Sequence, residues 1–359
     1  MAGRMMVMAG GTGGHVFPAL AVATEMQQRG WEVFWLGTRN SFEARVIPQQ
    51  GIAMEWVSIQ GMRGKGLLRK LLMPLQLLRA MFQAASVIRN RKPDVVLGMG
   101  GFVSGPGGLV ARLLGRPLVI QEQNTVPGMT NQWLAKIAKR VFEAFPGSFA
   151  AERGAVVSGN PVRAEICALA EPQQRLAQHT GPVRLLVLGG SLGAQALNEL
   201  LPAALAKFTA GSERPQVRHQ AGRDKAAQTE KSYAQHGVSA EVTEFIEDMA
   251  AAYAWADLVV CRSGALTVSE LTAAGVASLL VPYPHAVDDH QTKNAAFLVQ
   301  QQAALLMPQA ELTADSLAAQ LQQLLQDKPR LLAMAQAARS LAVVDSSRII
   351  ADACEEVAL

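Results

Sequence analysis

The chain has 359 residues, of which 50% are hydrophobic and 17% are charged, and its formal net charge is +4. A chain of this length and composition can bury a large core, and it is longer than one ordinary domain. Two domains are therefore expected. The three cysteines, Cys167, Cys261 and Cys354, fit no metal-ligand or disulfide spacing, which indicates free thiols in a reducing compartment.

The N-terminus resembles a secretory signal, because Arg4 precedes an apolar run and ALAVA resembles a cleavage site. The apolar run, MMVMA at residues 5–9, is shorter than the roughly 7–15 residues that such a signal needs. Nor does the chain contain about eighteen consecutive apolar residues, so no spanning helix is expected. We therefore expect a protein made and kept in the cytosol.

Short apolar runs alternate with helical stretches along the chain. The runs are residues 5–9, 32–37, 94–100, 117–123, 184–190, 258–264 and 277–283. Continuous apolar strands separated by helices are typical of a parallel sheet with helices on both faces, so the predicted class is α/β.

An internal repeat indicates how the domains are arranged. Residues 5–20 align without a gap on 185–200, half a chain further on, and a weaker match relates 94–104 to 257–267. Two doubly wound domains in tandem explain both matches, and GNPVR at 159–163 marks the expected junction.

Glycine-rich turns between a strand and a helix suit phosphate, because they place backbone N–H groups at a positive helix end. The first such turn, AGGTGGHVFP at 9–18, lacks the third glycine of a dinucleotide fingerprint, where Val16 stands instead. The P-loop pattern also fails at Gly64 and Lys65. A nicotinamide, flavin or P-loop enzyme is therefore not expected.

The second half carries CRSGALTVSELTAAG at 261–275. Backbone N–H groups at this helix start, with the hydroxyls of Thr267 and Ser269, suit a diphosphate. Glu270 in the same helix suits either the two hydroxyls of a ribose or stabilisation of its own helix terminus, and its position alone leaves both roles open.

Seven motifs together resemble the MurG family of bacterial N-acetylglucosaminyltransferases, over essentially the whole chain. They are GGTGGHVFPALA, GMGGFVSGPGG, QEQN, GNPVR, GGSLGA, the stretch from DMAAAYAWADLVV to SELTAAG, and HQTKNA. The resemblance implies a GT-B fold, two Rossmann-like doubly wound domains facing each other across a cleft. It also implies transfer of GlcNAc from UDP-GlcNAc to the 4-hydroxyl of MurNAc-pentapeptide on undecaprenyl pyrophosphate, lipid I to lipid II, with inversion.

The resemblance also implies the division of labour. Residues 1–162, with a C-terminal helix at about 343–359, would form the acceptor and membrane-facing domain, and 163–342 would bind UDP-GlcNAc. The uracil would lie near Ile246, the ribose on Glu270 and the sugar near Gln291. The expected diphosphate ligands are Arg163, Ser191, Ala265, Leu266, Thr267, Val268 and Ser269. The first domain would line the cleft against the donor sugar with Thr12, Gly13, Gly14 and Asn124.

Inverting transfer needs a base near the acceptor hydroxyl and charge relief on the departing UDP. His15 is the first candidate base, because the positive end of its helix disfavours the imidazolium, and its repeat counterpart is Gln195. Hydrogen bonding to the loop or to a phosphate is the other role open to His15. Glu122 is the alternative base, although it also suits ordering of its own QEQN loop.

No metal or cofactor is expected. The chain contains no Asp-x-Asp sequence, so Arg163 and the helix start at Ala265 are the expected stabilisers of the leaving group. His285 and His290, with two aspartates between them, lack compact metal-ligand spacing and fit a loop near the donor.

The segment from 57 to 92 holds basic residues and no acidic one, with leucines at near-helical spacing. Such a face suits contact with the anionic lipids of the membrane surface, although packing of the leucines into the core has the same spacing. The expected contacts are Lys65, Arg69, Lys70, Leu72, Leu75, Arg79 and Phe82. Interleaved aromatic residues are too few for nucleic-acid binding.

These inferences place the protein at the cytoplasmic face of the inner membrane, as a peripheral enzyme. Its expected partners are UDP-GlcNAc, the lipid-linked acceptor and anionic lipids, with the cell-wall and division machinery as further candidates. Two alternatives remain: another UDP-sugar enzyme on the same plan, such as a UDP-GlcNAc 2-epimerase or a different lipid glycosyltransferase, and a non-catalytic nucleotide-sugar-binding scaffold.

Overall fold

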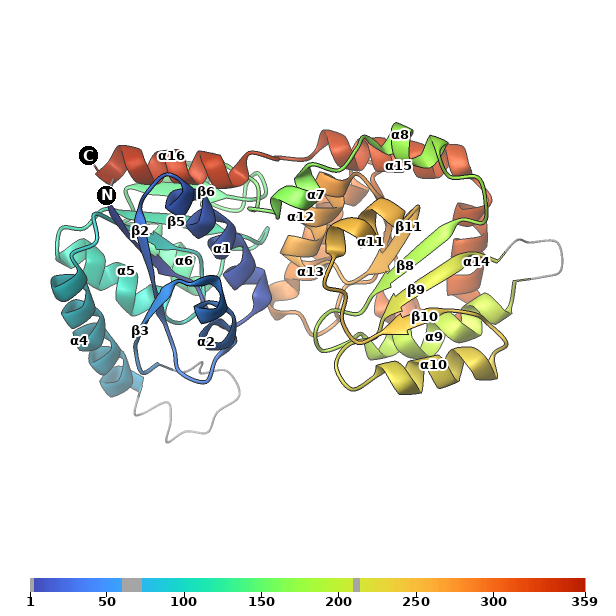
Figure 1. The fold of residues 1–359 in the computed structure, drawn as a ribbon, viewed down its shortest axis with the longest axis horizontal. Helices are drawn as coiled ribbons and strands as arrows, with labels where there is room; N and C mark the ends of the chain where they lie inside the picture. The colour runs from blue at the N-terminus through green and yellow to red at the C-terminus, as the bar shows by residue number, and fades with distance from the viewer. Residues whose placement is uncertain (1–2, 60–72, 209–213, 359) are drawn as a thin grey trace. The chain divides into compact units, whose positions relative to one another are not determined.

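The computed structural model describes residues 3–59, 73–208 and 214–358. The chain divides into two compact units, Met1–Val162 with Val343–Leu359, and Arg163–Ala342. Each unit is built on a parallel sheet with helices on its faces (Figure 1). Every apolar run singled out in the sequence forms a strand, which confirms the α/β class.

Within the described residues of unit 1, seven parallel strands are ordered β3-β2-β1-β4-β5-β6-β7. Their bounds are β1 Arg4–Met8, β2 Glu32–Gly37, β3 Ala53–Trp56, β4 Val95–Gly98, β5 Leu118–Glu122, β6 Arg140–Glu143 and β7 Val156–Val157. The central strand β1 pairs with β2 on one side, Met5 opposite Val33, and with β4 on the other, Met5 opposite Val95.

Helices cover both faces of this sheet. They are α1 Gly13–Gln28, α2 Phe42–Val46, α4 Met73–Arg91, α5 Ser104–Leu113, α6 Met129–Leu134 and α16 Ser346–Ala358, with single turns η1 Pro48–Gln50 and η2 Ala151–Arg153. Because successive side chains of a strand point to opposite faces, Met5 and Val7 pack with α1 and α16. Met6 and Met8 pack with α4 and α5.

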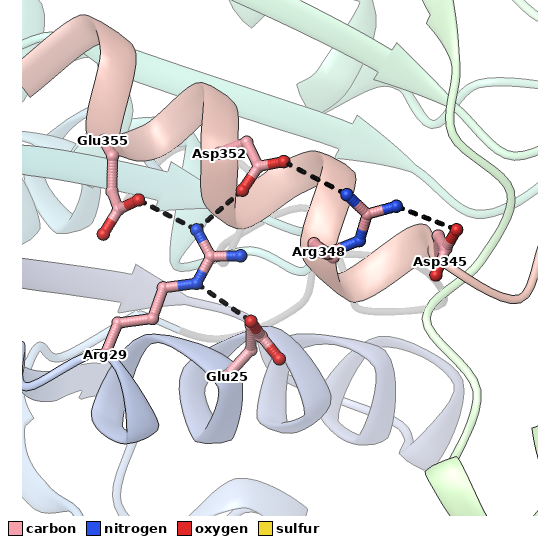
Figure 2. Close-up of polar contacts among 6 residues, drawn as sticks. All are labelled: Glu25, Arg29, Asp345, Arg348, Asp352 and Glu355. Carbon is pink, nitrogen blue, oxygen red and sulfur yellow. Dashed lines mark hydrogen bonds and ion pairs between the residues drawn. The ribbon is translucent and has the colours of Figure 1, made fainter.

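The last helix, α16, belongs to unit 1 and runs beside α1 (Figure 1). Figure 2 shows the Arg29 guanidinium at the C-terminal end of α1 between Glu25 of its own helix and the carboxylates of Asp352 and Glu355 on α16, with N–O distances of 2.7–2.9 Å. The apolar side of α16 adds Ile350 to the core. Burial of this apolar face and a shared arginine hold α16 on α1.

The described residues of unit 2 form a six-stranded parallel sheet, ordered β10-β9-β8-β11-β12-β13. The strands are β8 Arg184–Leu188, β9 Gln216–Gln220, β10 Glu241–Thr243, β11 Leu258–Cys261, β12 Ala277–Leu280 and β13 Ala304–Leu306. The helices are α7 Ala164–Cys167, α8 Pro172–Ala177, α9 Gln195–Ala206, α10 Ala226–Gln235, α11 Met249–Trp255, α12 Ala265–Ala274, α13 His290–Val299, α14 Ala314–Leu325 and α15 Lys328–Ser340, with turns η3 Val287–Asp289 and η4 Gln309–Glu311.

The two sheets explain the internal repeat. The first match places β1 on β8, and both strands lie between the strand that follows them and the strand after a longer connection, as β2-β1-β4 and β9-β8-β11. The second match places β4 on β11, which are these same neighbours. The repeat therefore reflects one strand order used twice.

Candidate functional site

The glycine-rich loop of unit 1, residues 9–12, joins β1 to α1 at the C-terminal edge of the sheet. Gly11 has a φ of +95°, a conformation that favours glycine. The loop after β4 packs directly against it, because a Cβ on Gly101 would overlap the backbone of Gly10. The exposed Thr12 and Gly14 and the half-buried Gly13 form the first residues of this helix start.

A buried carboxylate, Glu43 on α2, holds this loop. Its side chain is 1% exposed and accepts hydrogen bonds from the backbone N–H of Gly11, at 3.1 Å, and from the N–H and hydroxyl of Thr38. Burial alone would raise the pKa of Glu43, but hydrogen bonds from Ser41 and from the backbone outweigh it and lower this pKa below 4.5. The carboxylate therefore stays ionised and orders the loop.

His15 lies in the first turn of α1 and its ring is fixed by Gln123. The amide nitrogen of Gln123 donates to the Met99 carbonyl at 3.0 Å and to Oε1 of Gln121 at 2.7 Å. The oxygen of the same amide lies 2.8 Å from Nδ1 of His15 and can only accept. The neutral ring therefore carries its hydrogen on Nδ1, and its lone pair is on Nε2.

The other candidate base, Glu122, is 2% exposed and lies at the end of β5. One carboxylate oxygen accepts from the backbone and side-chain amide of Asn124, at 2.9 and 3.2 Å. The other accepts from the Gly128 N–H at 3.0 Å and from the Asn131 amide at 2.9 Å. These four donors come from residues 124–131, so the carboxylate orders its own loop, the role that the sequence left open beside catalysis.

In unit 2 the predicted donor residues lie after the C-terminal ends of parallel strands. Ser191 follows β8, Ile246 follows β10, the start of α12 follows β11, and Gln291 on α13 comes after β12. Carboxyl ends of parallel strands share one edge of a sheet, which is where ligands bind in open α/β folds. The α12 set is Ala265, Leu266, Thr267, Val268 and Ser269, the last of which donates its hydroxyl to the Ala265 carbonyl at 3.1 Å.

Glu270 on α12 is 8% exposed, and each of its carboxylate oxygens has a partner. The Tyr253 hydroxyl donates to one oxygen at 3.0 Å, and the Arg163 guanidinium lies 3.4 Å from the other. The structure thus brings Arg163, predicted for the diphosphate, beside Glu270, predicted for the ribose. Burial raises the pKa of Glu270 above 4.5, and Arg163 and Tyr253 oppose this shift.

The remaining donor candidates have local contacts. The side-chain oxygen of Gln291 accepts from the Tyr283 backbone N–H at 2.9 Å, which fixes the end of the amide that faces this loop. His290 lies 2.7 Å from the Val287 carbonyl through Nδ1. Among residues 3–59, 73–208 and 214–358, no three His, Cys, Asp or Glu side chains gather as a metal site.

The exposure of side chains on α4 bears on the two roles proposed for the leucine-rich segment, contact with the membrane and packing into the core. It buries Ala80, Ala84 and Ile88, whereas Leu75 is 67% and Phe82 is 75% exposed. Leu75 and Phe82 therefore do not pack into the core, whereas Ile88 does. Arg79 is also exposed, and the predicted contacts Lys65, Arg69, Lys70 and Leu72 lie outside the described residues.

Two further observations on unit 1 and on the helices bear on membrane contact. In the described part of the chain, none of the helices has the length and apolar character needed to cross a membrane. Exposed apolar residues also occur on the neighbouring helices of unit 1, where Leu113 of α5 is 71%, Met129 of α6 is 69% and Trp133 of α6 is 64% exposed.

Two residues of this site escaped the sequence analysis. Gln123 stands in QEQN, where the motif alone gives it no role, and the only local signal at Glu43 is its place near the helix start that follows Ser41. Their importance comes from contacts with His15 and Gly11, which lie far from them in the sequence.

Comparison with known proteins shows the family. Residues 5–143 match the glycosyltransferase family 28 N-terminal domain, and 184–350 match the C-terminal domain of that family. A protein of Methylococcus capsulatus is 53% identical over 100% of this chain and 99% of its own length, and one of Aeromonas hydrophila is 53% identical over 100% and 98%. Both are named UDP-N-acetylglucosamine–N-acetylmuramyl-(pentapeptide) pyrophosphoryl-undecaprenol N-acetylglucosamine transferase.

Solved structures show the same family and the same fold. The crystal structure of Acinetobacter baumannii MurG has a TM-score of 0.86 and 43% identity, covering 99% of each chain. The calicheamicin glycosyltransferase CalG4 has a TM-score of 0.68 at 16% identity, over 99% of this chain and 98% of its own, a likeness of fold alone. With two parallel-sheet α/β domains and these matches, the chain belongs to glycosyltransferase family 28, within the MurG family of GT-B enzymes.

Proposed function

We propose that this chain transfers GlcNAc from UDP-GlcNAc to MurNAc-pentapeptide pyrophosphoryl-undecaprenol, the step from lipid I to lipid II of peptidoglycan synthesis. The observation that carries this proposal is 53% identity, over 100% of this chain and 98–99% of the relatives' own length, to proteins named for that reaction. The C-terminal sheet edge of each unit fits it, because that of unit 1 presents a proton acceptor and that of unit 2 presents groups suited to a nucleoside diphosphate.

In the proposed mechanism, His15 is the general base. The acceptor 4-oxygen attacks the anomeric carbon of GlcNAc as the bond to the UDP oxygen breaks, which inverts that carbon. The hydroxyl proton passes to Nε2 of His15, whose lone pair is available because Gln123 holds the hydrogen on Nδ1. Glu122 supports this site by ordering the loop that contains Asn124.

On the donor side, the developing negative charge of UDP would meet Arg163, Ser191 and the N–H groups at the start of α12. Glu270 would accept hydrogen bonds from the ribose hydroxyls, with Ile246 at the uracil and Gln291 at the sugar. The contact between Arg163 and Glu270 supports this arrangement, because a ribose and its adjacent diphosphate need their ligands side by side. From unit 1, Thr12, Gly13, Gly14 and Asn124 would contact the donor sugar, and the glycine-rich loop would also face the acceptor.

We also propose that α4 contacts the cytoplasmic surface of the membrane, which would place the enzyme there as a peripheral protein. The support is the outward orientation of Leu75 and Phe82 together with exposed Arg79 on the same helix. Apolar side chains enter the headgroup region while a basic side chain pairs with anionic lipid. A lipid-linked acceptor would then reach the enzyme without leaving the bilayer.

The reaction itself is tested by mixing the purified protein with UDP-GlcNAc and a lipid-linked MurNAc-pentapeptide. We expect UDP and a lipid-linked disaccharide with a β-1,4 bond, measured by chromatography and mass spectrometry. Epimerised UDP-sugar, or donor binding with no product from the folded protein, would overturn the proposal in favour of the epimerase or the scaffold.

The base assignment is tested at His15 and Gln123. His15→Ala should lower kcat by about 10²–10⁴-fold with the Kd for UDP unchanged, because only proton transfer is lost. Gln123→Met should lower kcat by about tenfold, and it should add little to His15→Ala, because it acts through the same ring. His236→Ala, at an exposed histidine, is the matched control. Additive losses from the two substitutions would contradict the assignment.

The ribose assignment predicts a pH dependence of UDP binding. Because the pKa of Glu270 is raised above 4.5, this carboxyl takes up a proton at a higher pH than usual and then accepts fewer hydrogen bonds. The Kd for UDP should therefore rise as the pH falls toward this raised pKa. Glu270→Gln should weaken binding by about tenfold and remove that part of the pH dependence, whereas the exposed Glu230→Gln should not. An unchanged Kd in Glu270→Gln would exclude the ribose role.

Membrane contact is tested by cosedimentation with phosphatidylglycerol vesicles. The double variant Leu75→Gln with Phe82→Gln should reduce the bound fraction by roughly tenfold or more, because two apolar side chains no longer leave water. Val344→Gln, at another exposed apolar residue, should bind like the wild type. Equal binding by all three proteins would move the contact away from α4.

A further inference from the structure

The sequence RHQAGRDK at 218–225 contributes no residue to the proposed mechanism, yet it contains a buried polar side chain at the donor edge of unit 2. Gln220 is the last residue of β9 and is 5% exposed. Its backbone lies between Leu188 at the end of β8 and Thr243 at the end of β10. Gln220 therefore lies where the loops that follow these two strands begin.

The side chain of Gln220 binds both loops. Its amide oxygen accepts from the Gly190 N–H at 2.9 Å, and its amide nitrogen donates to the Gly190 carbonyl at 3.0 Å. The same nitrogen donates to the Glu244 carbonyl at 2.9 Å. Gly190 directly precedes Ser191, and Glu244 lies two residues before Ile246. One amide thus ties the proposed diphosphate loop to the proposed nucleobase loop.

We infer that Gln220 is a positioning residue that holds the diphosphate loop, residues 189–193, and the nucleobase loop, residues 244–247, at a fixed separation for UDP. The inference rests on the proposed function, because it takes UDP as the ligand that spans the two loops. A ligand that meets two preorganised loops loses less affinity to ordering them than one that meets two independent loops.

A directed chain of hydrogen bonds supports the strand end that carries Gln220. Asn198 donates its amide N–H to the Ala221 carbonyl, so its side-chain oxygen is left to accept from Nε2 of His219, at 3.0 Å. Nδ1 of His219 then accepts from the Tyr233 hydroxyl at 2.9 Å. Burial lowers the pKa of His219 to about 3, so the ring stays neutral and this direction is kept at neutral pH.

The glycines of the two neighbouring loops fit closely together at this point. Gly193 and Gly222 both have positive φ, +72° and +93°, and a Cβ on Gly193 would overlap the Ala221 carbonyl oxygen. The Ala221 carbonyl is the group at which the His219 chain ends. The diphosphate loop is therefore held at two points: Gly193 packs against the Ala221 carbonyl, and Gly190 is bound by the Gln220 amide.

Glutamine suits this position because it offers an acceptor and two donors on one rigid plane. Glutamate keeps the acceptor for Gly190 but loses both donors. Methionine keeps much of the length and volume but makes none of the three bonds. Gln220→Met therefore removes the hydrogen bonds that fix the separation of the two loops, and it removes no contact with the ligand.

The test compares UDP with uridine, which reaches only the nucleobase and ribose groups. In Gln220→Met the Kd for UDP should rise about tenfold, equivalent to ~1.4 kcal/mol, and the Kd for uridine should change less than about twofold. The KM for UDP-GlcNAc should rise while the KM for the lipid-linked acceptor stays unchanged. Gln216→Met, at an exposed glutamine of the same strand, is the control and should behave like the wild type.

Equal losses of UDP and uridine affinity in Gln220→Met would overturn the inference, because general destabilisation of unit 2 weakens the binding of both ligands. Unchanged UDP affinity would overturn it as well. If Gln220→Met does not fold, Gln220→Asn keeps the chemistry but is too short to bridge both loops, and it must show the same selective loss of UDP. Failure of the wild type to bind UDP would instead contradict the proposed function.

Discussion

Hydrogen bonds from buried polar side chains to the segments that follow the strands are the interactions on which the candidate sites of both units depend. Parallel strands bring their carboxyl ends to one edge, but the glycine-rich turns that follow are intrinsically mobile. In unit 1 the Glu43 carboxylate binds Gly11 and the Gln123 amide binds His15. In unit 2 the Gln220 amide binds Gly190. Such groups cost free energy if buried without partners, so each contact fixes both of its members.

The fold was largely predictable because buried parallel strands leave continuous apolar runs. The cores of β1, β4, β8 and β11 have that signature, and their repetition indicated two tandem domains of one plan, whose shared strand order the structure shows. β9 was not singled out, because QVRHQ alternates apolar and polar residues although His219 and Gln220 are buried. Their burial depends on partners from other elements, which a local pattern does not contain.

Candidate site residues could be predicted where a sequence motif marks them. They could not be predicted where their role depends on a contact with a residue distant in the sequence. His15 and Glu270 stand in recognisable motifs near helix starts, but the hydrogen bond that sets the ring of His15 joins residues 108 positions apart. The sequence leaves Glu122 open as a base or as a residue that orders its loop, and it does not show the four donors that support the second role. Likewise, the spacing of leucines along α4 is the same for a core-facing and a solvent-facing helix, whereas the exposure of Leu75 and Phe82 is not.

The proposed proton transfer depends on the tautomer of His15 that Gln123 sets, with the hydrogen on Nδ1 and the lone pair on Nε2. Nitrogen-15 NMR of the histidine-labelled protein measures this directly, because protonated and unprotonated ring nitrogens have well-separated shifts, and comparison with His15→Ala assigns the signal. In the neutral ring of His15 we expect a protonated Nδ1 and an unprotonated Nε2, and loss of this single tautomer in Gln123→Met. A neutral ring with its hydrogen on Nε2 in the wild type, or the same single tautomer in Gln123→Met, would contradict this role of Gln123.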